Sequence, residues 1–185
     1  MAKNYDSFLH IKNKFINNYS AISLITYLFG IGDRHLENFL IQTSTGEIVM
    51  IDFGYSFGSS IELPIPEIIP FRLTTSFIDL TKPVGVTGSF RKSMLNAYDA
   101  LKNKMQLIVD YCDVFVDDPL MEWVWVSRRQ LASSSNPHVQ ISGTNNSFSV
   151  SQDAPEKKIF TNKIKVVENK LRGTNPRKIL EQLLT

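Results

Sequence analysis

A hairpin with a polar residue directly before its first strand and another directly after its second constrains this chain more than any other feature. Two short apolar runs, residues 39–41 and 48–51, surround the turn sequence Ser44-Thr45-Gly46. In an antiparallel hairpin, the residue before the first strand and the residue after the second lie at the same end. Here those residues are Asn38 and Asp52. The sequence therefore predicts that an amide oxygen and a carboxylate oxygen can share one hard cation.

These residue types are the ones that phosphoryl transfer needs. Mg²⁺ binds amide and carboxylate oxygens, and it neutralises charge on the phosphates of ATP. We interpret Asp52 as the main metal ligand and Asn38 as the second. Asp33 precedes Asn38 by the interval that separates the catalytic Asp from the metal-binding Asn in protein kinases. We interpret it as the group that orients the attacking hydroxyl and accepts its proton. His35 has two open roles, donation to a phosphate oxygen or support of Asp33.

A simpler interpretation is that Asp33 and His35 form a polar turn and that Asp52-Phe53-Gly54 is a chance tripeptide. The joint pattern favours the phosphoryl-transfer site, because a lone triplet would carry little weight. The residues predicted to support the site are Arg34, Phe53, Gly54 and Arg72. For Arg72 we prefer a pairing with a carboxylate over a contact with phosphate.

The order Asp33-Arg34-His35 places the histidine after the aspartate, the reverse of the order in conventional protein kinases. Together with residues 30–39, 51–58 and 63–74, this order resembles the phosphatidylinositol 3-kinase superfamily, and within it the related protein kinases of the DNA-dependent protein kinase type. The resemblance implies the carboxy-terminal lobe of a protein-kinase-like fold, mainly α with a small β-hairpin (α+β). It also implies a serine/threonine kinase that uses ATP with Mg²⁺ or Mn²⁺. In that family the matching catalytic and metal-binding residues are Asp33, His35, Asn38 and Asp52.

The same resemblance implies a nuclear enzyme that phosphorylates proteins at DNA ends, with the Ku heterodimer, in non-homologous end joining. Such an enzyme also has an amino-terminal kinase lobe and upstream helical repeats. The segment before Gly30 is too short to hold that lobe, and no Gly-x-Gly-x-x-Gly occurs in the chain. We therefore expect a fragment that binds ATP poorly by itself.

Two alternatives have a different function. A phosphoinositide kinase lobe needs basic residues to hold the inositol phosphate. Residues 55–70 contain no Lys or Arg but do contain Glu62 and Glu67, which favours a protein hydroxyl as substrate. The other alternative is an inactive interaction fragment. The presence of all four polar site residues (Asp33, His35, Asn38 and Asp52) counts against it.

The composition limits the class of protein and the compartment that we expect. A net charge of +2 gives no independent case for nucleic-acid binding. The single cysteine, Cys112, excludes an internal disulfide, fits a reducing compartment and is expected to be a small buried side chain. The start of the chain has no secretory signal, and the longest apolar stretch, near residues 21–31, is too short to span a membrane. We expect a soluble intracellular protein without a membrane partner.

The rest of the chain predicts three regions: a lobe core (1–130), a flexible Ser/Asn-rich insert (131–154) and carboxy-terminal helices (155–185). Three prolines between residues 64 and 70 predict extended turns after the triplet. A turn at 117–119 is expected to open a short helix. Apolar spacing and caps predict helices over residues 5–16, 21–29 (capped by Ser20 and ended by Gly30), 73–80, 89–111, 156–172 (ended by Gly173) and 176–184.

Overall fold

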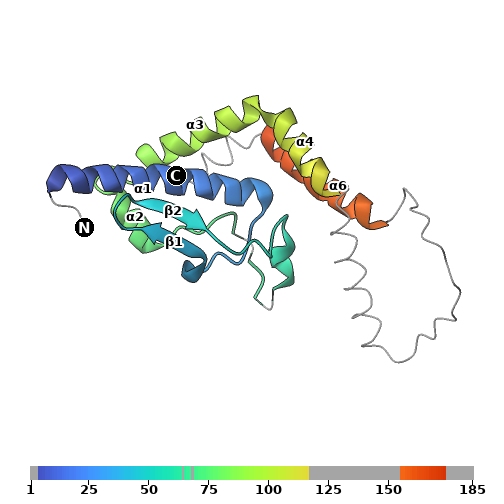
Figure 1. Cartoon of the computed structure of the whole chain (residues 1–185), viewed down its shortest axis with the longest axis horizontal. Helices are drawn as coiled ribbons and strands as arrows, with labels where there is room; N and C mark the ends of the chain where they lie inside the picture. The colour runs from blue at the N-terminus through green and yellow to red at the C-terminus, as the bar shows by residue number, and fades with distance from the viewer. Residues whose placement is uncertain (1–3, 64, 68, 117–154, 174–185) are drawn as a thin grey trace, which may run out of the picture. The chain divides into compact units, whose positions relative to one another are not determined.

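The computed structural model describes residues 4–63, 65–67, 69–116 and 155–173 (Figure 1). They belong to two units, one made from 1–105 with 167–185 and the other from 106–166. The first unit carries every residue of the predicted site. The predicted turn at 117–119, the insert at 131–154 and the helix at 176–184 lie outside the described residues.

The first unit is built on one long helix, α1 (Tyr5–Phe29). Asn4 caps its start, because its side-chain oxygen accepts a hydrogen bond from the Ser7 N–H at 2.8 Å. The predicted break before residue 21 is wrong. Ser20 is fully buried and donates its hydroxyl to the Asn17 carbonyl, so it bonds back into the helix and does not cap a new one. Gly30 ends α1 as predicted, in the left-handed conformation.

The predicted hairpin is present. Strands β1 (Phe39–Gln42) and β2 (Glu47–Met50) are antiparallel, with Phe39 opposite Met50 at the open end. The hairpin lies beside α1 (Figure 1), and side chains of α1 bind it. The Ile48 N–H donates to the Asn18 side chain at 2.7 Å, and Lys14 pairs with Glu47 at 2.8 Å. Because α1 fixes the hairpin, it also fixes the loops that enter and leave it.

The described residues between the hairpin and α2 (Thr75–Thr81) form no α-helix, as the prolines predict, although a short 3-10 helix forms at Ser59–Glu62. The predicted helix 89–111 is two helices, α3 (Ser89–Asn103) and α4 (Met105–Val116). Lys104 leaves the helical conformation at the end of a polar run, 102–104, which buries no side chain. In α3 the buried side chains are Phe90, Met94 and Tyr98.

Helix α6 (Pro155–Arg172) follows the predicted spacing and ends at Gly173, which has a positive φ. Its buried side chains are Phe160, Ile164, Val167 and Leu171. In the first unit, Lys170 donates to the carbonyls of Tyr27 and Leu28, at 2.6 and 3.3 Å. A cation thus caps the end of α1, directly before the predicted catalytic loop.

Cys112, in α4, is buried and free, as expected. Burial, with a smaller contribution from Asp113, raises the pKa of its thiol.

Among the described residues, every helix is too short or too polar to cross a bilayer.

Candidate active site

The loop that leaves α1 runs beside the segment that follows the Asp52-Phe53-Gly54 triplet. Three backbone hydrogen bonds join the two: Gly32 N–H to the Tyr55 carbonyl (2.7 Å), Phe57 N–H to Phe29 (2.7 Å) and Gly58 N–H to Gly30 (2.9 Å). A Cβ at Gly30 would lie 2.8 Å from the Gly58 nitrogen, so this approach requires glycine. The predicted catalytic loop and the triplet are therefore parts of one layer.

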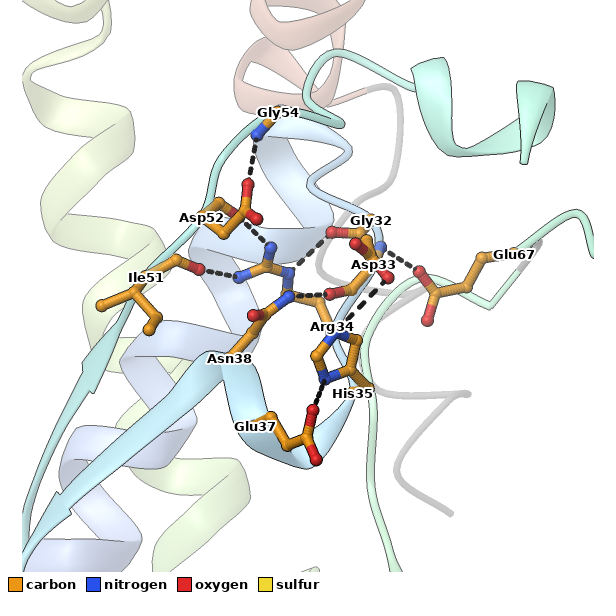
Figure 2. A network of polar contacts seen from close by, with 10 residues as sticks. All are labelled: Gly32, Asp33, Arg34, His35, Glu37, Asn38, Ile51, Asp52, Gly54 and Glu67. Atoms are coloured by element: carbon orange, nitrogen blue, oxygen red, sulfur yellow. Dashed lines mark hydrogen bonds and ion pairs between the residues drawn. The ribbon is translucent and has the colours of Figure 1, made fainter. Parts of the chain in front are cut away.

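The guanidinium of Arg34 connects the two sides of this layer (Figure 2). Nε donates to the Gly32 carbonyl at 2.7 Å, Nη1 to the Ile51 carbonyl at 3.1 Å, and Nη2 to the Asp52 carbonyl. The guanidinium also lies over the Phe53 ring, with Cζ 5.7 Å from the ring centroid. Only 2% of Arg34 is exposed. Burial lowers its pKa, and nearby carboxylates oppose that shift, Asp33 most strongly.

Asn38 and Asp52 lie at the same end of the hairpin, with the Ile51 N–H donating to the Asn38 carbonyl at 3.1 Å. The Asn38 side-chain nitrogen donates to the Asp33 carbonyl at 2.7 Å, which leaves its side-chain oxygen as the atom suited to a cation. The Asp52 carboxylate is exposed and accepts the Gly54 N–H at 3.2 Å. Both Asp33 and Asp52 have positive φ values, 56° and 58°. Such backbone strain is concentrated at functional sites.

The donor set suits Mg²⁺. Among the described residues, no group of three or more His, Cys, Asp or Glu side chains is placed to hold a metal. One carboxylate and one amide would leave most coordination positions for phosphate oxygens and water, which is how Mg²⁺ is usually held beside a nucleotide.

His35 is half exposed and lies between two carboxylates. Its Nε2 is 3.9 Å from Asp33 Oδ1, and its Nδ1 is 4.0 Å from Glu37 Oε2. Both distances are too long for hydrogen bonds. The two roles considered for His35 thus both remain predictions.

Arg72 does not have the carboxylate partner that we expected, as far as the described residues go. Its Nε is buried without a hydrogen-bond partner in the described part of the chain. Its backbone carbonyl instead accepts the Tyr19 hydroxyl, and its charge partly opposes the burial that raises the pKa of Tyr19. Arg72 therefore contacts the α1 core through its main chain.

Sequence reasoning missed the role of Glu67. Its Oε2 accepts the backbone N–H of Asp33 at 2.5 Å (Figure 2). The sequence offered one weak signal, a carboxylate in a segment without basic residues, and we used it only as an argument against a phosphoinositide substrate.

Comparison with known proteins shows the family to which the chain belongs. The family described as "Phosphatidylinositol 3- and 4-kinase" matches residues 1–125. The chain belongs to the phosphatidylinositol 3- and 4-kinase family. Among its relatives is the DNA-dependent protein kinase catalytic subunit of Dictyostelium discoideum, 36% identical over 99% of this chain. The serine/threonine-protein kinase TEL1 of Saccharomyces cerevisiae is 34% identical over 88% of it. The match covers 4% of the first relative and 6% of the second, so the chain spans a small part of their length.

Solved structures of the family confirm the fold. A structure of the "FAT and kinase domain of CtTel1" matches 96% of this chain with a TM-score of 0.73 and 25% identity, and the match covers 11% of that protein. A complete CtTel1 dimer matches equally well over 6% of its length. The prediction of a mainly α family fold with a small hairpin is therefore correct.

Proposed function

We propose that this chain is the carboxy-terminal lobe of a serine/threonine protein kinase that transfers the terminal phosphoryl group of ATP to protein hydroxyls. The observation that carries the proposal is the arrangement around Arg34. One buried guanidinium joins the loop of Asp33 and Asn38 to the backbone of Asp52. Two oxygen ligands and a proton acceptor thereby share one small region.

Each residue has a role in this mechanism. The Asn38 amide oxygen and the Asp52 carboxylate would hold Mg²⁺, which when bound supplies positive charge to the phosphate oxygens. Asp33 accepts the proton of the substrate hydroxyl. The hydroxyl oxygen forms a bond to the terminal phosphorus of ATP while the bond between that phosphorus and the leaving ADP oxygen breaks. His35, close to Asp33, adds a donor for a phosphate oxygen or steadies the base.

The outer face of the hairpin supports a nucleotide site that needs a second lobe. Leu40 and Val49 are cross-strand partners and are 53% and 57% exposed. Ile51, two residues after Val49, continues the same face up to Asp52. Exposed apolar surface beside metal ligands suits the base of a nucleotide, covered from the other side by an amino-terminal lobe. We propose that this lobe belongs to the active enzyme and that the lobe core at 1–130, the insert at 131–154 and the helices at 155–185 are the parts of this chain.

The substrate is inferred from the segment after the triplet. Residues 55–70 contain no basic side chain that could bind an inositol phosphate. The Glu67 carboxylate accepts a hydrogen bond from the backbone N–H of Asp33. A protein hydroxyl is thus favoured over a phosphoinositide. By analogy with the named relatives, we propose a nuclear role in the DNA damage response, specifically non-homologous end joining with Ku at DNA ends.

The test uses this chain joined to an amino-terminal kinase lobe. Asp52→Ala should abolish Mg²⁺-dependent transfer to a serine peptide. Asp33→Asn should lower kcat by about 100-fold or more with little change in ATP affinity. Asp6→Ala, which removes an exposed carboxylate in the first turn of α1, is the matched control and should keep normal turnover. Normal turnover by Asp33→Asn would refute its assignment as the base. Preference for phosphatidylinositol over the peptide would support the lipid kinase instead.

A further inference from the structure

Glu67 follows the Asp52-Phe53-Gly54 triplet in the chain, yet its side chain is turned to the catalytic loop (Figure 2). The Asp33 N–H donates to Glu67 Oε2 at 2.5 Å, a hydrogen bond with a charged acceptor. The two residues are 34 positions apart. A long-range contact thus determines where the Asp33 backbone lies.

The position of Glu67 is itself fixed by Ser60. The Glu67 N–H donates to the Ser60 carbonyl, and the Ser60 hydroxyl donates to the Glu67 carbonyl, both at 3.3 Å. Gly32 makes room for this pair, since a Cβ there would lie 2.0 Å from Ser60 Cβ and 3.2 Å from Glu67 Oε2. Residues 60 and 67 therefore form one anchored piece that meets the catalytic loop directly.

Asp33 needs such support because its φ of 56° is unfavourable for a residue with a Cβ. Its carbonyl is held by Asn38 and its N–H by Glu67. The first contact comes from within the loop, and the second comes from the segment after the triplet. Together they define the direction in which the Asp33 side chain leaves the backbone.

We propose that Glu67 is a positioning residue for phosphoryl transfer, whose carboxylate fixes the backbone of Asp33. The general base is then aligned only when the segment containing Ser60 and Glu67 adopts the arrangement seen here. This proposal rests on the proposed function and adds to it a direct connection between the segment after the triplet and the reacting proton.

The experiment compares Glu67→Ala and Glu67→Gln in the enzyme assembled with its amino-terminal lobe, with Asp6→Ala, which removes an exposed carboxylate in the first turn of α1, as the control. Glu67→Ala removes the acceptor, and kcat should fall by about 10- to 100-fold, as for a displaced catalytic group. The KM values for ATP and peptide should change by less than about twofold. Glu67→Gln keeps an acceptor oxygen and should restore most of the lost turnover. Asp6→Ala should keep normal kcat.

A double mutant separates positioning from a general structural role. If Glu67 acts through Asp33, Glu67→Ala should lower kcat by less than about twofold in an Asp33→Asn background. An undiminished loss in that background would overturn the proposal.

A second readout needs no turnover. In Glu67→Ala, hydrogen exchange measured by mass spectrometry should accelerate in the peptide that contains Asp33 and stay unchanged in the hairpin. Unchanged exchange at Asp33, or kcat equal to that of the unmodified enzyme, would overturn the proposal. An inactive unmodified enzyme would count against the proposed function alone, because the exchange measurement still tests the contact.

Discussion

Replacing Arg34 by methionine tests whether the buried guanidinium holds the site together. The substitution keeps a long apolar side chain but removes three donated hydrogen bonds. The Gly32 carbonyl belongs to a buried residue and loses its partner there, at a cost of about 1–3 kcal/mol. The carbonyls of Ile51 and Asp52 belong to exposed residues that water can reach, so each should cost only about 0.5–1 kcal/mol.

The sum is a destabilisation of about 2–5 kcal/mol, which for a chain of this size lowers Tm by roughly 5–15 °C. Differential scanning fluorimetry measures the shift, and Lys92→Met on the exposed side of α3 is the control. Arg34→Lys should recover only part of the stability, because an ammonium group cannot reproduce the fork of three N–H donors. A melting temperature for Arg34→Met within about 2 °C of the unmodified chain would refute the reasoning.

Two further substitutions test the packing on either side of the site. Gly32→Ala places a Cβ 2.0 Å from that of Ser60, so urea denaturation should show a loss of about 1–3 kcal/mol in the free energy of unfolding. Gly54→Ala, whose Cβ would have its nearest contact at 3.3 Å, is the control and should lose less. Equal losses for the two variants would contradict this. Burial raises the pKa of Tyr19, so above pH 10 the unfolded chain ionises before the folded one and stability falls as pH rises. Tyr19→Phe should therefore show a shallower alkaline loss of stability in urea titrations, and an unchanged slope would argue against the buried phenol.

Local spacing determined the hairpin and the ends of two helices. Apolar runs on both sides of Ser44-Thr45-Gly46 are sufficient to set the strands, and the strands place Asn38 and Asp52 at one end. Helix α6 and its stop at Gly173 also follow from periodicity and a cap. These features depend on residues close together in the chain, which is why they are readable without a structure.

The errors in helix boundaries have a tertiary cause. Three polar residues at positions 17, 18 and 20 look like a break, but Asn18 binds the hairpin and Ser20 is buried, so α1 continues through them. The run 102–104 looks like the exposed face of one helix, but the chain leaves the helical conformation there. Helix propensity alone does not distinguish these two cases, because partners elsewhere in the fold decide whether a polar residue is bonded in place.

The sequence by itself determined which residues we propose as cation ligands and which as the proton acceptor. Only the tertiary structure decided what holds them. The Arg34 bonds to Ile51 and Asp52 and the Glu67 bond to Asp33 join residues that are 17, 18 and 34 positions apart. Contacts over such separations leave no periodic trace in the sequence, since they depend on how the chain folds back on α1.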